Sequence, residues 1–278
     1  MRPYQLLQSQ VCTSAEDFLE KLSPLGTFFR DADVDAPWFF RGQGRPYDLI
    51  PSALRKNPST GKYPIEELIG FPFDSYDHRI AAQMRLLHDF FRISDQHGLV
   101  LPEDTQSVRS LFEIYENDRA TEFGGEWLDN NRELLSPLAL AQHYGLPTFL
   151  LDWSYNAFTA AYFAAQDAIT IAKKRDAEQK IRQTAIEKYI SVLKQSVDKS
   201  ILDDALAQLN TTSVADELVV WALYYPPLGT IDAIGSNEAF LIATAPSATN
   251  PNLHAQQGVF TWPNPTYCLK TDNDLLPF

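Results

Sequence analysis

The chain of 278 residues carries 23 basic and 36 acidic side chains, so its formal net charge at pH 7 is −13. This charge repels polyanions over most of the surface and argues against a protein that lives on DNA or on an acidic membrane, although local basic patches can still exist. A hydrophobic content of 45% supports an ordinary buried core and argues against disorder.

The cysteines and the apolar runs indicate the cellular compartment. Cys12 and Cys268 come without a CxxC pair or a Cys/His cluster, so they support neither a disulfide framework nor a structural zinc site. No apolar run approaches the ~18 residues that a membrane span requires, and the N-terminus leads into polar residues. We therefore expect a soluble, cytoplasmic protein that binds no metal and has no membrane partner.

Residues 13–93 contain three helical patterns and one strand pattern. Residues 13–23 combine a capping box with apolar residues on one face, which predicts a first helix. Residues 38–41 predict a short buried strand that runs into a Gly-Gln-Gly turn at 42–44. Apolar spacing near 3.6 residues predicts helices over 66–70 and 80–93.

A helix, a strand and a second helix are predicted over residues 136–165. Ser136 as N-cap and Pro137 at the first helical position predict a helix that stops at Gly145, with His143 in its last turn. Residues 148–151 predict a buried strand with 152–154 at its carboxyl end. The next helix, over 157–165, is apolar on all sides and is therefore expected to be buried.

The remaining patterns set the expected fold class. Residues 173–204 lack Gly and Pro and have helical spacing, which predicts an inserted or peripheral helical hairpin. Strands are predicted over 218–225, 239–244 and 257–262. Five strands at irregular spacing predict a single α+β domain over 1–278, with two small, mostly antiparallel sheets around a cleft and helical decorations.

Two polar-aromatic blocks, 38–44 and 142–154, place charged side chains between strongly apolar flanks. A buried charge must be paired or bind something, so both blocks are candidate sites. The Arg41 guanidinium matches phosphate geometry, and the glycines that follow it leave room for a ligand. The alternative is a structural ion pair between Arg41 and Asp152 that clamps two neighbouring strands.

Other polar residues in these blocks also have two interpretations. The helix dipole favours protonated His143, which is either a general base or hydrogen-bond donor, or a satisfied core histidine. Gln256 and Gln257 either present an amide to a substrate or form a polar pair at a strand edge. A hydrolase triad with Ser154 is disfavoured, because this serine lies in no Gly-x-Ser-x-Gly elbow.

Four blocks of this sequence together resemble the FRG-domain family of bacterial and phage-related proteins. They are Phe40-Arg41-Gly42, the run 141–154, the apolar segment 160–164 and the segment 255–260. The resemblance spans about residues 20–265. This chain carries Phe149 where many members carry Arg, so any role of that Arg is absent here.

A more distant resemblance is to the ADP-ribosyltransferases, in which a strand Arg holds NAD, a second block lines the nicotinamide pocket and a late strand carries a catalytic Glu. By position, the resemblance assigns NAD binding to Arg41, Gly42, Gln43, Tyr144, Asp152, Trp153 and Ser154, and catalysis to Arg41, His143, Gln256 and Gln257. The aromatic residues have core packing as their alternative role. No Glu occupies the late motif, where the chain has neutral amides.

The two resemblances together imply a NAD-consuming enzyme that transfers ADP-ribose to an RNA, DNA or protein acceptor. They imply further that it is the toxin of a toxin–antitoxin or antiphage system, with an antitoxin protein as partner. The missing Glu leaves three outcomes open: altered chemistry, a different acid such as Glu238, or a non-catalytic nucleotide-sensing or protein-binding module.

Overall fold

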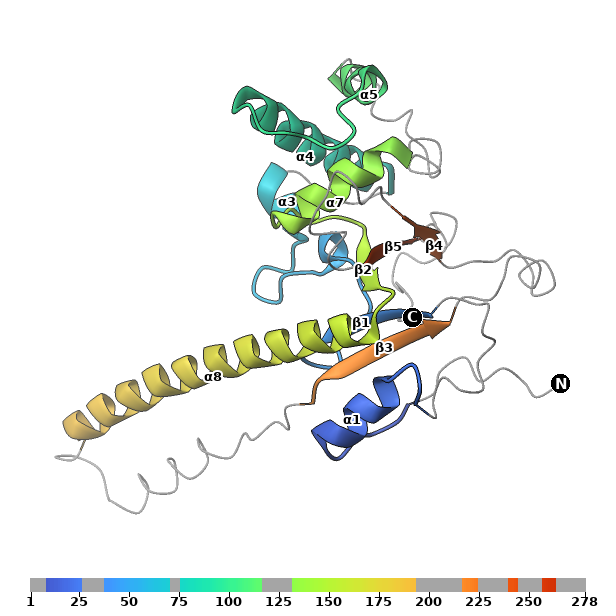
Figure 1. Cartoon of the computed structure of the whole chain (residues 1–278). Coiled ribbons are helices and arrows are strands. Elements are labelled where there is room, and N and C mark those ends of the chain that lie inside the picture. The colour runs from blue at the N-terminus through green and yellow to red at the C-terminus, as the bar shows by residue number, and fades with distance from the viewer. Residues whose placement is uncertain are drawn as a thin grey trace. The chain divides into compact units, whose positions relative to one another are not determined.

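The computed structural model describes residues 9–26, 38–70, 76–116, 132–193, 217–224, 240–244 and 257–263 (Figure 1). Its α-helices are α1 (Ala15–Leu22), α3 (Pro64–Ile69), α4 (Tyr76–Gln96), α5 (Gln106–Glu116), α7 (Leu135–His143) and α8 (Ala157–Leu193). Two 3-10 turns, η1 (Ser52–Leu54) and η3 (Arg132–Leu134), accompany them. The first helix begins as expected from its cap, because the Ser14 side chain accepts a hydrogen bond from the Asp17 backbone N–H.

The strands are β1 (Trp38–Gln43), β2 (Leu151–Ser154), β3 (Val219–Tyr224), β4 (Phe240–Ala243) and β5 (Gly258–Pro263). Four lie where they were expected, whereas the strand predicted over 148–151 begins only at Leu151 and continues to Ser154. These strands form an antiparallel sheet in the order β3-β1-β2-β5-β4, which confirms the α+β class. The described strands make one sheet instead of the two that were expected. The reason is that β2 pairs on both sides, through Phe40↔Ser154 with β1 and through Asp152↔Phe260 with β5.

The chain divides into two compact units. The first contains Met1–Phe40, Asp48–Ala157 and Ala222–Phe278, and the second contains Arg41–Tyr47 and Phe158–Trp221. The boundary passes through β1 and β3, and each unit is described by itself below. A single domain over 1–278 with an insertion at 173–204 stays a prediction.

The core of the first unit lies among α3, α4, α5 and α7, which are grouped together in Figure 1, and it includes residues of β5. Ile80, Met84 and Leu87 of α4 are fully buried, at the spacing that predicted this helix. Phe149, at the position where many family members carry Arg, is buried and packs edge-on against Trp262 with ring centroids 5.7 Å apart. It therefore serves the core in this chain.

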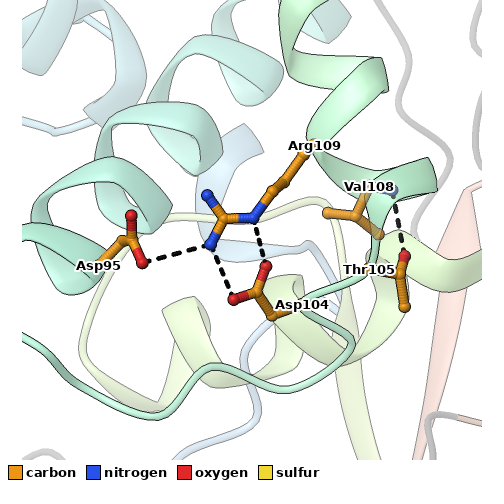
Figure 2. A network of polar contacts seen from close by, with 5 residues as sticks. All are labelled: Asp95, Asp104, Thr105, Val108 and Arg109. Atoms are coloured by element: carbon orange, nitrogen blue, oxygen red, sulfur yellow. Dashed lines mark hydrogen bonds and ion pairs between the residues drawn. The ribbon is translucent and has the colours of Figure 1, made fainter.

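An ion-pair network holds the junction between α4 and α5 (Figure 2). Arg109 donates to Asp104 from Nε at 2.6 Å and from Nη2 at 2.8 Å, and to Asp95 from Nη2 at 3.2 Å. Thr105 accepts a hydrogen bond from the Val108 backbone N–H at 3.2 Å, so its hydroxyl caps α5. The side-chain hydrogen bond from Arg109 holds the pKa of Asp104 below its ordinary value of 3.8.

The start of α7 differs from the expectation. Ser136 is not the N-cap, because the 3-10 turn Arg132–Leu134 leads directly into a helix that begins at Leu135. Ser136 is buried in the first turn, where its Oγ has no hydrogen-bond partner among the residues that the structure describes. Pro137 is tolerated there because the first N–H groups of a helix have no intrahelical acceptor. At the other end, Gly145 takes a φ of 89°, which confirms the predicted stop.

The long helix α8 also differs from the expectation. Residues 157–193 form one helix, so the predicted helix at 157–165 continues without a break into the region predicted as a separate hairpin. No Gly or Pro interrupts this stretch. The first turns are not buried on all sides: Phe158, Tyr162 and Phe163 are 44%, 59% and 40% exposed. Residues 194–204 lie outside the described ranges.

Candidate functional site

The space beside the glycines of the first block is filled by the backbone of α8, within the second unit. A Cβ added to Gly42 would lie 1.8 Å from the backbone O of Ala160 and 2.7 Å from the backbone N of Ala164. A Cβ added to Gly44 would lie 2.4 Å from the backbone N of Ala168. The expected ligand space beside Arg41 is therefore taken by α8, whose alanines at i, i+4 and i+8 let its backbone approach the strand.

Polar contacts reinforce this strand–helix packing. The Gly44 backbone N–H donates to Asp167 Oδ2 on α8 at 2.8 Å. Gln43 is buried, and its Oε1 accepts a hydrogen bond from Trp221 Nε1 at 2.6 Å. Gln43 thus satisfies the indole N–H of half-buried Trp221 with its own buried amide oxygen. Arg41 itself is half-buried in β1, and its assignment to phosphate stays a prediction.

The second block contains a short hydrogen-bond relay at the surface of the first unit. The Thr148 hydroxyl donates to Oε1 of Gln142, and Nε2 of Gln142 donates to Asp152 Oδ1 at 3.0 Å. The Thr148 oxygen also accepts from the Leu150 backbone N–H at 3.3 Å. A carboxylate only accepts hydrogen bonds, so chemistry dictates which end of the amide faces Asp152.

The relay ends in an exposed carboxylate. Thr148 is fully buried, Gln142 is half-buried at the end of α7, and Asp152 in the middle of β2 is exposed. The oxygen of Asp152 that accepts from Gln142 is held in place, and the side chain still faces solvent. An oriented and accessible carboxylate is a group that can stabilise positive charge or accept a hydrogen bond from a sugar hydroxyl.

Two residues from outside the block hold the segment between α7 and β2. Gln83 of α4 is buried, donating to the Pro147 carbonyl at 3.3 Å and accepting from the Phe149 backbone N–H at 3.0 Å. Ser52 accepts from the Thr148 backbone N–H at 3.1 Å. These side chains satisfy backbone groups that no neighbouring strand reaches, so the irregular segment can lie inside the protein.

Two residues that the resemblance places in the nicotinamide pocket contribute to the scaffold. Trp153 is buried, and its Nε1 donates to Thr261 Oγ1 at 2.9 Å across the β2–β5 pairing. Ser154 is buried, and its Oγ accepts from the Asn156 backbone N–H at 3.0 Å at the entry to α8. Both polar atoms are used by neighbouring strands and turns.

The other candidates of the first unit are exposed. His143 is exposed at the end of α7, so it is not the core histidine of the alternative interpretation. Tyr144 is 69% exposed, with its ring 5.6 Å from that of His143 and 6.1 Å from that of Phe90. The two residues directly follow Gln142 in the chain. Because both are exposed, their rings are accessible to a ligand.

Gln257 is placed beside the end of β2. It has a φ of 48°, and its carbonyl accepts from the Tyr155 backbone N–H at 3.1 Å, directly before the Ser154↔Gly258 pairing. Its side chain is exposed. Gln256 and Glu238 lie outside the described residues. Among the residues that the structure describes, no group of three or more His, Cys, Asp or Glu side chains is suited to a metal ion.

The roles of Gln142, Thr148 and Gln83 were not predicted from the sequence. Gln142 and Thr148 belong to the second block, but nothing local indicates that they hydrogen-bond to each other. Gln83 has a clearer signal, because it occupies a core position in the apolar pattern of α4, next to Met84. A polar side chain at such a position is expected to satisfy buried groups.

A family model for the FRG domain matches residues 36–177, which is more than half of the chain. The match contains both polar-aromatic blocks and the first half of α8. The chain belongs to the FRG-domain family. Neither the comparison with curated proteins nor the comparison with solved structures gave a match. In the described ranges, no helix has the length and apolar character needed to cross a membrane.

Proposed function

We propose that this protein is a NAD-consuming ADP-ribosyltransferase, the toxic effector of a toxin–antitoxin or antiphage system, with an RNA, DNA or protein acceptor. The observation that carries the proposal is the exposed carboxylate of Asp152, which the Gln142 amide orients at 3.0 Å. Asp152 lies in the block that, in the resemblance to ADP-ribosyltransferases, lines the nicotinamide pocket.

The reaction needs a negative charge that this chain does not supply from a late-strand Glu. When the bond between nicotinamide and the ribose C1′ breaks, nicotinamide leaves with the electron pair and positive charge develops on the ribose. A fixed carboxylate stabilises such charge most when its position is set in advance. We assign this role to Asp152, while exposed His143 accepts the proton that the acceptor nucleophile loses as it bonds to C1′.

Exposed residues of the first unit offer groups that fit parts of the dinucleotide. Tyr144 offers an accessible ring on which a base or nicotinamide can stack. Gln257 offers an exposed amide, and Gln256 keeps the role that the resemblance gives it. α8 fills the space beside Gly42 and Gly44, so these glycines give the ligand no room. The phosphate-binding role that the resemblance gives to Arg41 stays a prediction.

A labelling experiment with NAD carrying a labelled adenylate phosphate tests the proposal. Wild-type protein and cell lysate should yield a labelled macromolecule, and nuclease or protease digestion then identifies the acceptor. Asp152→Asn keeps the shape but removes the charge, so we expect transfer to fall by about 10²–10³-fold. Asp89→Asn changes an exposed acid of α4 in the same way and should leave transfer unchanged. Equal transfer by wild type and Asp152→Asn would contradict the proposal.

A non-catalytic binding module is the second candidate function. The filling of both glycine positions by α8 favours it, because the first block then serves packing. The exposed Phe158, Tyr162 and Phe163 favour it as well, because large accessible aromatics are typical of contact surfaces. A wild-type protein that binds NAD in calorimetry but transfers no label would indicate a nucleotide-sensing module.

A further inference from the structure

The second part of α8 has different surroundings from the first part. Ala160 and Ala164 are buried, whereas the described side chains from Lys173 to Lys188 are exposed, except for half-buried Arg175. Within the described ranges, no residues bury the side chains of this stretch, so its described surface faces solvent. The stretch belongs to the second unit.

The charge of this stretch is opposite to that of the chain. Residues 173–188 carry six basic and three acidic side chains, in a protein whose formal net charge is −13. A local basic surface on an acidic protein creates a directional field, because it attracts polyanions to one place and the remaining surface repels them. The net charge of the whole chain does not exclude a local basic patch of this kind.

The lysines of this stretch gather on one side of the helix. At about 100° per residue, Lys173, Lys174, Lys180 and Lys188 fall within roughly 120° of the helix circumference. Asp176 and Glu178 fall outside this sector. We call these four lysines the lysine face of α8. Lys173 and Lys180 are separated by about 10 Å along the helix axis.

Three of these lysines form no ion pair with the acids that the structure describes in this stretch. Asp176 pairs with Arg175 at 3.7 Å, although Lys180 lies four residues further on and would be a favourable partner. Among the described residues, Lys173, Lys174 and Lys180 form no ion pair. Three extended ammonium groups thus face solvent from one side of one helix.

We propose that the lysine face of α8 binds the phosphate backbone of a nucleic acid. Lysine ammonium groups are point charges that suit phosphate contacts without base readout. Interfaces with proteins are centred on buried aromatic or aliphatic anchors, and the large apolar side chain described in this stretch is a single one, Ile181, which is 70% exposed. A polar and basic surface whose described side chains include one isolated large apolar residue matches nucleic acid better.

The proposal goes beyond the transferase function, because binding needs neither NAD nor Asp152. It would select nucleic acid among the acceptors of that reaction. The lysine face also extends past the family match, which ends at residue 177. The binding property would therefore belong partly to the region that this chain adds after the matched residues.

Fluorescence anisotropy with a labelled 20-base-pair DNA duplex and a single-stranded RNA of the same sequence tests the proposal. The assay uses the full chain without NAD, over a series of salt concentrations. We expect Lys173→Gln with Lys180→Gln to weaken binding about tenfold or more at low salt, and to reduce the salt slope by about 2. The matched control is Lys56→Gln with Lys62→Gln, which removes two exposed lysines of the first unit.

Several outcomes would overturn the proposal. One is binding that is equally weakened in both double variants, because the effect would then come from net charge. Another is the absence of salt-dependent binding by the wild type to either probe. Tighter binding to a poly-glutamate peptide than to either nucleic acid would identify an acidic protein as partner. Circular dichroism of each variant shows whether the helix content is retained, and a preference between the two probes distinguishes DNA from RNA.

Discussion

The two polar-aromatic blocks look alike in sequence but have different roles in the structure: the first packs a strand against α8, and the second orients an exposed carboxylate. In the first, Gly42 and Gly44 let the backbone of α8 approach the strand, and Gln43 satisfies the Trp221 indole. In the second, Thr148 and Gln142 use their polar groups to orient an exposed carboxylate. Small and polar residues beside a charged residue therefore indicate a site only where a polar side chain stays exposed in the packed structure, as the Asp152 carboxylate does.

The largest expected effect comes from adding one methyl group to the first block. In Gly42→Ala the new Cβ would lie 1.8 Å from the backbone O of Ala160, so the strand and helix must separate. We expect a loss of about 3 kcal/mol or more in the free energy of unfolding, at the upper end of overpacking costs. Urea denaturation measures it. A second substitution, Ala160→Gly, should not restore the lost stability, because the clashing atom is the backbone O of residue 160. If Gly42→Ala leaves the free energy of unfolding nearly unchanged, the space beside Gly42 would again be interpreted as room for a ligand.

The next effect concerns the support of the second block. Gln83→Leu removes the partners of the Pro147 carbonyl and of the Phe149 N–H, both buried. Each orphaned buried group costs roughly 1–3 kcal/mol, so we expect a loss of about 2–4 kcal/mol in the free energy of unfolding. The exposed Gln96→Leu at the end of α4 is the control and should change stability little. A loss in Gln83→Leu no larger than in the control would mean that water replaces the side chain.

A smaller stability effect should accompany a large functional effect in the relay. Gln142→Leu leaves Asp152 exposed to water but removes the acceptor of the buried Thr148 hydroxyl. We therefore expect a loss of about 1–3 kcal/mol in the free energy of unfolding. If the proposed transfer operates, kcat should fall at least tenfold with KM nearly unchanged, because the carboxylate is no longer held in position. Gln142→Asn, which shortens the amide, should not restore kcat. Wild-type kcat in Gln142→Leu would show that the relay only supports the fold.

The smallest effect is expected at the α4–α5 junction, which serves as a reference outside both blocks. The side-chain hydrogen bond from Arg109 lowers the pKa of Asp104 below its unfolded value, so folding is stabilised above about pH 3.8. This contribution is lost as the pH falls through the folded pKa. Arg109→Met should therefore be less stable than wild type at pH 7, and the gap in Tm should close as the pH falls below the folded pKa of Asp104. A gap that is independent of pH would assign the effect to the stacking of Arg109 on Phe91.

Much of the secondary structure could be predicted because it depends on local chemistry. The strands β3, β4 and β5 lie within runs bounded by Gly or Pro, the Ser14 hydroxyl caps α1, and Gly145 ends α7 with a positive φ. The strand predicted over 148–151 begins only at Leu151, because side chains from distant elements bond the Thr148 and Phe149 backbone N–H groups. Two further predictions were wrong for local reasons. The turn before Leu135 made Ser136 an interior residue, and unbroken helix formers joined 157–165 to the residues that follow.

The positions of Gly42 and Gly44, and of the polar residues that interrupt the apolar runs, can be read directly from the amino-acid sequence. The sequence could not determine what fills the place of the missing Cβ at Gly42, because α8 begins more than a hundred residues later. Nor could it determine that Gln83 reaches Pro147 and Phe149, 64 and 66 residues further along the chain. These contacts follow from the tertiary structure, because strand pairing and helix packing bring together groups that are far apart in the sequence. The same packing buries Trp153 and Ser154 and leaves Asp152 between Leu151 and Trp153 accessible.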